Sequence, residues 1–329
     1  MPLPNPPDPK ALPVEMRPYR TGDEDAVNRA FNEVFAQQRS LAEWRWKFQP
    51  AANGSQIMLA VEAGTGEVLA QFAVQRVPVR IDGKPRLAGH SVDDFCRRRS
   101  DLAFTRTYMR LSESFHRDYG QAGQFDFLYG FPGTRHLNLL LHHEHYEQPE
   151  AVPYLLKVPG RAGFSFTRWR VGPMESEASL TAFEARCAAR YPSAAVRDGT
   201  WLRRRYLSHP GQPYRSVAAT CGGTISAWAV FRRRGDQLVL GDLLWDGQHP
   251  AALRALDRWA VRQAQAEGAA ALAAWLHGDR EATEQLLRLG WQSKPNPLAL
   301  AATAFPYSRD LPERLLPTMY FTMGASDLF

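Results

Sequence analysis

The sequence predicts an α/β fold made of two tandem lobes, each a mixed, mostly antiparallel sheet flanked by helices. Three observations lead to this prediction. Helix-like and strand-like segments follow one another in the same order in both halves of the 329-residue chain. Similar spacings separate Gly120 from Gly268 and Tyr146 from Trp291, which end corresponding elements. Hydrophobic residues make up 44% of the chain, enough for two cores.

From these repeats we expect three parts. The proline-rich residues 1–13 form a disordered leader, residues 14–165 form the first lobe, and residues 166–329 form the second. The connection between the lobes falls within residues 160–175. If this division is right, the two halves superpose as similar lobes.

The first half begins with two helix-capping signals. Thr21 stands three residues before Glu24, and Ser40 has the same position relative to Glu43, a spacing typical of a capping box. Beyond these helices, the apolar runs "IMLAVEA" and "EVLAQFAVQRVPVRI" are separated by "GTG", which predicts a β-hairpin. The stretch "LAGHSVDDFC" continues the sheet.

Further helices and strands follow in the same order in both halves. In the first half, apolar residues at helical spacing predict a helix over residues 102–119 that ends at Gly120. "FDFLYGF" then predicts a buried strand and "TRHLNLLLHHEHY" a short helix. In the second half, "QLVLGDLLWD" is a strand, "GQHP" a turn, and Pro250 opens a helix that ends at Gly268. The strand "AAALAAWL" and the helix "DREATEQLLRLGW" complete the repeat.

The charge of the chain favours anionic partners, because the formal net charge is +6. Three arginine triplets carry much of it, at residues 97–99, 203–205 and 232–234. A single triplet of this kind is typical of a solvated surface. The first triplet differs because it stands where a strand turns into a helix, and unpaired amides and the helix dipole attract an anion there.

Other features limit the class of protein. No apolar run reaches about 18 residues, so we expect no membrane span. The three cysteines are too few and too scattered for a disulfide framework or a zinc site, which favours a cytoplasmic location. The sequence "HHEHYE" looks like a metal cluster, but adjacent positions on a helix point in different directions, so we expect no metal.

This order of elements resembles the GNAT superfamily of N-acetyltransferases: helices, an antiparallel hairpin, then strand, anion-binding turn, helix, strand and helix. The segments "SLAEWRWKF", "LAGHSVDD", "LYGFP", "LRRRYLSHP" and "YFTMGASDLF" are similar, more narrowly, to two-lobed GNAT proteins often found with bacterial polysaccharide-biosynthesis genes. The resemblance implies an acyl-CoA-dependent N-acyltransferase that uses acetyl-CoA or another acyl-CoA. Its acceptor would be a small-molecule amine such as an amino sugar.

The resemblance assigns the coenzyme to the first turn, "CRRRSDLAF". Members of the superfamily hold the coenzyme A pyrophosphate with the amides of a glycine-containing turn, and this turn has no glycine. We expect arginine side chains to replace those amides. The predicted cofactor-binding residues are Phe95, Cys96, Arg97, Arg98, Arg99, Ser100, Asp101, Leu102 and Ala103. In the second turn, "WDGQHPAAL", Asp246 would repel a phosphate, so the first lobe is the better ligand site.

A catalytic acid is harder to assign. The superfamily commonly places a tyrosine four residues before the last Gly-aromatic pair, but those positions are Leu141 and Leu286 here. Tyr129, on the strand before "GFP", is a possible substitute. The alternative is a core tyrosine with a satisfied hydroxyl.

Transfer to an amine also needs a base for the ammonium proton. Asp93 and Asp94 lie on the strand that leads into the first turn, and by alternation they face opposite sides. One of them is predicted to be the base, and the alternative is a hydrogen-bonded or edge-exposed pair. In the resemblance, Trp44, Trp46 and His90 bind the acceptor, although the aromatic and basic "EWRWKF" could also stack on a nucleic-acid base.

Three functions remain open at this point. The first is the N-acyltransferase, acting as a monomer or homodimer without a nucleic-acid partner. The second is a non-catalytic acyl-CoA-binding or scaffold protein with degenerate GNAT lobes, because both turns and both tyrosine positions depart from the family pattern. The third is a Fem-like transferase that uses aminoacyl-tRNA, which the basic charge permits. Cys96 could be a nucleophile, but a packed thiol is the simpler interpretation.

Overall fold

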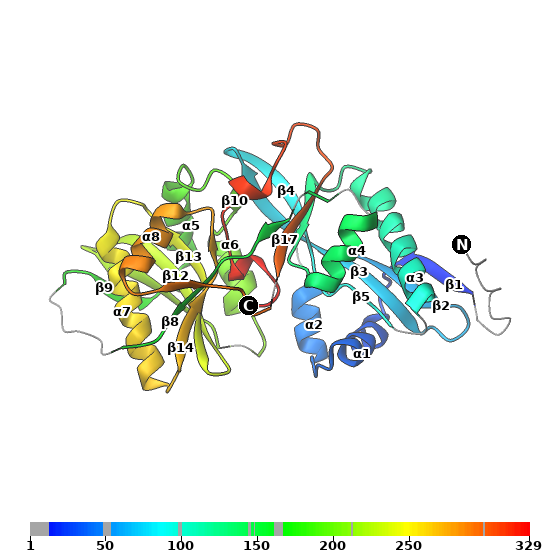
Figure 1. The fold of residues 1–329 in the computed structure, drawn as a ribbon, viewed down its shortest axis with the longest axis horizontal. Coiled ribbons are helices and arrows are strands. Elements are labelled where there is room, and N and C mark those ends of the chain that lie inside the picture. Colours follow the sequence, from blue (N-terminus) through cyan, green and yellow to red (C-terminus); the bar gives the residue numbers. More distant parts are fainter. Residues whose placement is uncertain are drawn as a thin grey trace. The chain divides into compact units, whose positions relative to one another are not determined.

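The computed structural model describes residues 13–48, 54–97, 101–143, 146–147, 149–160, 167–211, 213–298 and 300–329. The chain forms two compact units, described here one at a time (Figure 1). Unit 1 contains Met1–Arg76 and Ser91–Phe125, and unit 2 contains Val77–His90 and Asp126–Phe329. The predicted α/β class, with sheets flanked by helices, is confirmed. The expected boundary between residues 165 and 166 concerns the repeated lobes, does not coincide with this division, and stays a prediction.

Unit 1 is an antiparallel sheet covered by helices. Its elements are β1 (Val14–Pro18), α1 (Glu24–Phe35), α2 (Leu41–Phe48), β2 (Gln56–Glu62), most of β3 (Val68–Ile81), β5 (Phe95–Cys96), α3 (Asp101–Phe115) and the π-helix η2 (His116–Gly120). Strand β2 pairs antiparallel with β1 and β3, and β5 pairs with β3. The helix predicted over residues 102–119 is therefore present as α3 followed by η2.

The capping signals explain where the helices of unit 1 begin. At α2 the capping box is formed as predicted, because Glu43 N–H donates to Ser40 Oγ at 3.2 Å and Ser40 N–H donates to a Glu43 carboxylate oxygen at 2.9 Å. At α1 the predicted cap is wrong. The N-cap is Asp23 rather than Thr21, and Glu24 accepts the N–H of Gly22 at 2.7 Å.

Unit 2 contains the larger number of elements. They are the end of β3, most of β4 (Lys84–Ser91), β6 (Phe127–Gly130), α4 (Thr134–His143), β7 (Glu150–Ala151), β8 (Tyr154–Lys157), β9 (Arg170–Pro173), α5 (Glu177–Cys187), β10 (Ala194–Ala195), α6 (Gly199–Leu202), the π-helix η3 (Arg203–Leu207), β11 (Arg215–Cys221), β12 (Thr224–Arg234), β13 (Gln237–Trp245), α7 (Pro250–Ala266), β14 (Ala271–Ala274), β15 (Leu276–His277), α8 (Arg280–Arg288), β16 (Gln292–Lys294), β17 (Ala301–Pro306), the 3₁₀ turn η4 (Leu316–Thr318), β18 (Phe321–Thr322) and the 3₁₀ turn η5 (Met323–Ala325).

Two sheets in unit 2 exchange one strand each. We call them the first sheet, with strand order β3-β4-β6-β17-β7 within this unit, and the second sheet, with order β16-β8-β14-β13-β12-β11-β9. Strand β17, late in the chain, pairs with β6 and β7. Strand β8, from the first half, pairs with β14 and β16, and Figure 1 shows the green β8 beside the yellow β14. Each sheet is thus completed by a strand from the other half of the sequence.

Each sheet also contains a parallel pair at the equivalent place. Strands β4 and β6 pair in parallel up to His90 and Tyr129, and β13 and β14 do so up to Leu240 and Ala274. Helix α3 lies between the first two strands in sequence and α7 between the second two. The repeated strand-helix-strand order predicted from the sequence is therefore present in both halves.

A buried ion pair holds the second sheet to the elements around it. Arg197 and Asp242 are both completely buried, and Arg197 Nε donates to Asp242 Oδ1 at 2.7 Å. Tyr206 OH, at 2.7 Å, and Trp201 Nε1, at 2.9 Å, donate to the other carboxylate oxygen. Thr322 Oγ1 completes the set by donating to Oδ1 at 2.8 Å. We call these five residues the Asp242 network.

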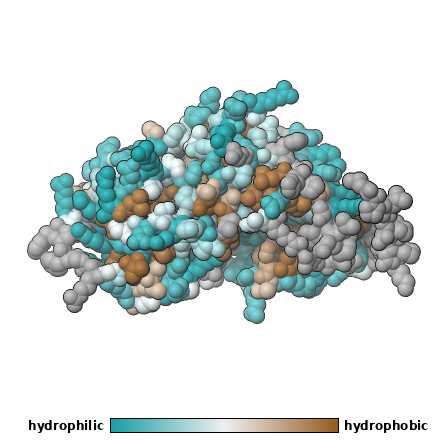
Figure 2. Space-filling model, in the orientation of Figure 1, coloured by the Kyte–Doolittle hydropathy of each residue, from teal (hydrophilic) through white to brown (hydrophobic). Residues whose placement is uncertain are grey.

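On the face shown in Figure 2, hydrophilic residues predominate and hydrophobic ones form separate patches. The large hydrophobic side chains that are more than a third exposed are likewise spread along the sequence, at Val34, Phe35, Leu141, Val158, Leu207, Leu287 and Leu298. Scattered residues of this kind are normal on protein surfaces. Among the described residues, no helix has the length and apolar character needed to cross a membrane.

We predict that Asp242→Asn lowers the free energy of unfolding by about 3–5 kcal/mol, because it leaves the buried Arg197 charge without its counter-charge. Urea denaturation measures this loss. The control is Glu177→Gln, which breaks the exposed pair with Arg203 and should cost less than about 1 kcal/mol. Equal losses in the two variants would contradict a special role for the buried pair.

Candidate functional site

His90 and Tyr129 come together in unit 2, as two predicted site residues on adjacent strands. They are the last paired residues of β4 and β6. Their rings stack with centroids 4.7 Å apart and planes 6° apart, and Phe131 lies edge-on to both. Both side chains are buried. The stacked pair marks the point where the paired part of the two strands ends.

The hydroxyl of Tyr129 is already engaged. It donates to the backbone carbonyl of Ala325 at 3.3 Å. Burial raises the pKa of Tyr129 well above the ordinary value of about 10, so the hydroxyl keeps its proton at neutral pH. The geometry matches the alternative of a core tyrosine with a satisfied hydroxyl, and the role of Tyr129 as an acid stays a prediction.

Asp93 is held by two cations in unit 1. Lys47 Nζ donates to its Oδ1 at 2.6 Å, and Arg39 Nη1 donates to its Oδ2. The Asp93 side chain is only 5% exposed, and Gln71 Nε2 donates to its backbone carbonyl at 2.9 Å. Asp93 also has a positive φ of 54°, which is unusual for a residue with a side chain. Both carboxylate oxygens are therefore committed to ion pairs that tie the strand region to α2 and to the α1–α2 connection.

Asp94 has neutral partners instead. Its Oδ1 accepts the N–H of Ala73 at 2.9 Å, and its Oδ2 accepts a hydrogen bond from Ser91 Oγ. The two neighbouring carboxylates thus engage different groups, as expected for successive residues of an extended segment. Hydrogen bonds of this kind were the alternative to a catalytic role, and which carboxylate acts as a base is not decided by them.

The first turn is described only at its two ends. Phe95 and Cys96 are buried in β5, and burial raises the pKa of the Cys96 thiol to about 11, which disfavours the nucleophilic thiolate. Arg97 pairs with Glu67 at 2.8 Å and with Glu33. Its guanidinium is therefore neutralised by two carboxylates of the chain.

The rest of the predicted cofactor site gives less information. Arg98, Arg99 and Ser100 lie outside the described residues. The backbone of Asp101, Leu102 and Ala103 forms the first turn of α3, as expected. The phosphate-binding role of all these residues stays a prediction.

The two predicted acceptor-binding tryptophans on α2 have different surroundings. Trp44 is completely buried and packs against Tyr19 and Phe48, with ring centroids 5.7 and 5.4 Å away. Trp46 is partly exposed. Trp44 is therefore part of the core of unit 1, and Trp46 is the better placed of the two to meet a ligand.

In the second sheet, the chain itself occupies the space between the diverging strands. We call residues 319–329 the C-terminal segment. Tyr320 OH donates to the carbonyl of Leu243 on β13 at 2.6 Å, and β18 pairs antiparallel with β15 beyond the end of β14. Gly241 makes room for the segment, because a Cβ there would lie 1.9 Å from the ring of Phe329. The segment is thus bonded to both strands.

The second turn is also occupied by the chain. Asp246 Oδ1 accepts the N–H groups of Gln248, at 2.9 Å, and His249, at 3.1 Å. Burial alone would raise the pKa of Asp246, but hydrogen bonds from the His249 ring and from these amides hold it below its ordinary value. The amides that could receive a phosphate at the start of α7 therefore already bind a carboxylate, which supports the prediction that the first turn is the better ligand site.

The other two arginine triplets have a role that sequence reasoning missed. Arg205 donates to the carbonyls of Gly324, Ser326 and Phe329, and Arg232 and Arg234 both donate to the carbonyl of Leu328. The solvated-surface interpretation is wrong for these arginines, because they hold the C-terminal segment. Runs of charge carry no mark that separates these two cases in the sequence.

The histidine-rich stretch gives no metal site among the described residues, which contain no group of three or more His, Cys, Asp or Glu placed to hold an ion. His142 and His143 end α4, and Glu144 and His145 lie outside the described residues.

Comparison with known proteins adds to this geometry. No protein-family model matches the chain. No curated protein matches it either. Solved structures do. A GCN5-related N-acetyltransferase from Anabaena variabilis matches with a TM-score of 0.64 at 9% identity, over 90% of this chain and 73% of that chain.

Two further structures are similar. Saccharomyces cerevisiae N-myristoyltransferase with bound myristoyl-CoA has a TM-score of 0.62 at 11% identity, over 91% of this chain and 81% of that chain. A GCN5-related glucosamine N-acetyltransferase region of a fungal β-N-acetylglucosaminidase has a TM-score of 0.60 at 13% identity, over 89% of this chain and 38% of that chain. At these identities the likeness shows the fold alone. The chain has the fold of GCN5-related N-acyltransferases, whereas the narrower likeness to polysaccharide-associated proteins stays a prediction.

We predict that Asp93→Asn lowers the free energy of unfolding by about 3–5 kcal/mol, because Arg39 and Lys47 lose their buried counter-charge. Urea denaturation is the measurement. Glu33→Gln, which removes a half-exposed partner of Arg97, is the control and should change stability by less than about 1 kcal/mol. A fully stable Asp93→Asn variant would leave the residue free for a chemical role.

Proposed function

We propose that the chain is an acyl-CoA-dependent N-acyltransferase that moves an acetyl group from acetyl-CoA to an amine. The observation that carries the proposal is the parallel pair of β4 and β6, with α3 between the two strands in sequence, in a fold shared with N-acetyl- and N-myristoyltransferases. The bound myristoyl-CoA of one of these neighbours supports an acyl-CoA as the donor.

A single coenzyme per chain follows from the occupied second half. The C-terminal segment lies where β13 and β14 diverge, and Asp246 already binds the amides of the second turn. The coenzyme therefore binds at the first turn, with its phosphates near residues 97–103. The second sheet has a supporting role.

In the proposed reaction, the amine nitrogen attacks the thioester carbon directly, the C–S bond breaks, and coenzyme A leaves as a thiolate. A base takes the ammonium proton. Asp94 is the favoured candidate, because its partners are a backbone amide and a hydroxyl, whereas Asp93 is bound to two cations. Without a covalent enzyme intermediate, the rate depends on positioning and on this proton transfer.

The acceptor is proposed to be a small molecule such as an amino sugar. The fungal neighbour described as a glucosamine N-acetyltransferase supports this choice. The proposal includes a cytoplasmic, bacterial protein that works as a monomer or homodimer.

A non-catalytic acyl-CoA-binding protein is the second candidate. Arg97 is already paired with two glutamates, and Asp93 with Arg39 and Lys47. Such internal pairing is what a degenerate site would contain. The two candidates differ in whether bound acyl-CoA is turned over.

Calorimetric titration with acetyl-CoA, followed by a thiol-release assay over a panel of amines, tests the proposal. We expect one acetyl-CoA per chain and release of coenzyme A with at least one amine. Asp94→Asn should then lower turnover by about 10²- to 10⁴-fold with little change in acetyl-CoA affinity.

Asp118→Asn, at a partly exposed carboxylate on η2, is the matched control and should leave turnover unchanged. Absence of coenzyme binding would exclude both candidates. Binding without turnover over the whole panel would favour the non-catalytic one, and two coenzymes per chain would contradict the supporting role of the second sheet.

The arginines of the first turn make a separate prediction. Replacing residues 97–99 with Ser-Gly-Ser should weaken binding of coenzyme A more than binding of pantetheine, which lacks the nucleotide phosphates, because charge-assisted contacts to phosphate are lost. Calorimetry with both ligands measures the difference. Replacing Arg186, an exposed arginine on α5, with serine is the control for net charge. An equal loss for the two ligands would show that the triplet does not hold the phosphates.

A further inference from the structure

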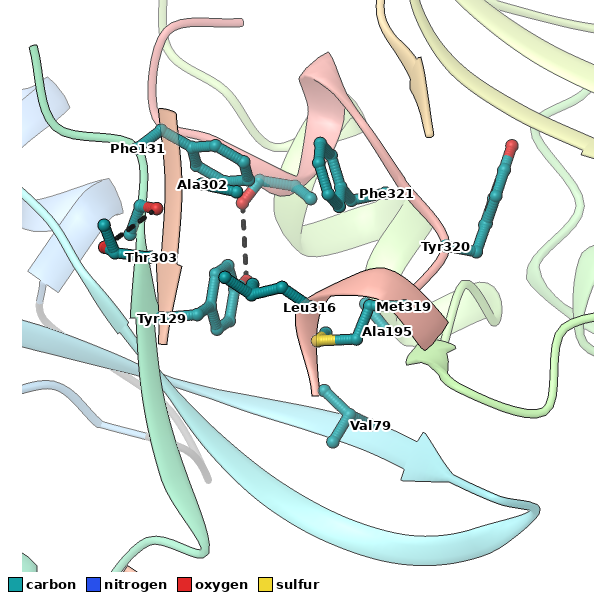
Figure 3. Close-up of a pocket in the computed structure, with 12 residues that line it drawn as sticks. Val79, Tyr129, Phe131, Ala195, Ala302, Thr303, Leu316, Met319, Tyr320 and Phe321 are labelled. Carbon is teal, nitrogen blue, oxygen red and sulfur yellow. Dashed lines mark hydrogen bonds between the residues drawn. The ribbon is translucent and has the colours of Figure 1, made fainter. Parts of the chain in front are cut away.

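A small pocket in unit 2 lies directly beyond the last paired residue of β6. Figure 3 shows Tyr129 and Phe131 on one side of it and Leu316 and Met319 on the other. The first two belong to the first sheet and the residue after β6. The other two belong to η4 and the start of the C-terminal segment. The pocket is therefore formed between a sheet and a segment that is held by the second sheet.

The lining of the pocket suits an apolar guest. Its described lining contains no charged side chain, and its three hydroxyl groups already donate to backbone carbonyls: Tyr129 to Ala325, Thr303 to Gly130, and Tyr320 to Leu243. A polar or charged group placed here would lose its hydrogen bonds to water without replacement. The amine of an acceptor is thus a poor guest, whereas a hydrocarbon group is a good one.

The size of the pocket limits that guest. The volume open to the centre of a water molecule is about 10 Å³, which is close to the space of a single water. A methyl group is of similar size. A longer chain would overlap the side chains of Leu316 and Met319, unless these moved.

The wall that carries Leu316 and Met319 is firmly anchored. Thr322 belongs to the Asp242 network, and Arg205 binds three carbonyls beyond it. Close packing also fixes the chain at Met319, because a Cβ at Gly278 would lie 2.4 Å from the Met319 carbonyl oxygen. The pocket therefore cannot widen without disturbing contacts of the second sheet.

We propose that this pocket receives the methyl group of the acetyl thioester, and that Leu316 and Met319 set the upper limit on acyl chain length. The inference rests on the proposed function, since it requires that the chain binds an acyl-CoA. It gives the C-terminal segment a place in substrate selection.

The test is a calorimetric series with coenzyme A, acetyl-CoA, propionyl-CoA and butyryl-CoA, which needs no knowledge of the acceptor. The wild-type protein should bind acetyl-CoA more tightly than butyryl-CoA. Met319→Ala and Leu316→Ala should shift the ratio of affinities toward the longer thioesters by about 10- to 200-fold per methylene group accommodated. Ala302→Val, which fills the pocket, should weaken acetyl-CoA binding relative to coenzyme A.

Leu286→Ala is the matched control. Leu286 is buried and lines a separate apolar cavity of the same size in unit 2, so its truncation has a similar effect on packing. Its acyl-length preference should remain that of the wild type. A shift in Leu286→Ala equal to that in Met319→Ala would overturn the inference, as would equal wild-type affinity for all four ligands. Absence of coenzyme A binding would instead overturn the proposed function itself.

Discussion

The buried pair of Arg197 and Asp242 is the interaction on which the second half of the structure depends. Burial alone would lower the pKa of Arg197, but the Asp242 carboxylate raises it above its ordinary value, so both groups stay charged. Such a pair is stable only when its remaining donors and acceptors are satisfied. Here Arg197 also donates to the Ala195 carbonyl and to Thr322, and Asp242 accepts from Trp201 and Tyr206. Segments far apart in the sequence are thereby fixed to β13 at one carboxylate.

The exchange of β8 and β17 gives this anchoring a wider effect. Because each sheet contains a strand from the other half of the chain, neither sheet is complete when one half is taken alone. The second sheet then holds the C-terminal segment where its own parallel strands diverge, and the same segment supplies one wall of the pocket beside Tyr129. A half that binds no coenzyme of its own can in this way shape the site of the other.

The sequence predicted the elements well and their partners poorly, for a physical reason. The Ser40–Glu43 capping box and the repeated strand-helix-strand order depend on residues close together in the chain, and both are present. Strand exchange depends on which distant strand is nearest, and the pattern of β17 is the same whichever sheet receives it. The arginine triplets were misjudged for the same reason, since backbone carbonyls supplied from a distant segment leave no trace in the local sequence.

The two turns show two ways of satisfying the same helix start. At α7, the Asp246 carboxylate takes the amides that an external anion would use, so the second turn is complete without a ligand. At the first turn, Arg97 is neutralised by Glu33 and Glu67, and this pairing leaves any phosphate contact to the residues that follow it. If a coenzyme binds there, its phosphates must either be held by those residues or compete with the two glutamates. Competition would make binding weaker in the wild type than in a Glu67→Gln variant, because that variant frees part of the Arg97 guanidinium.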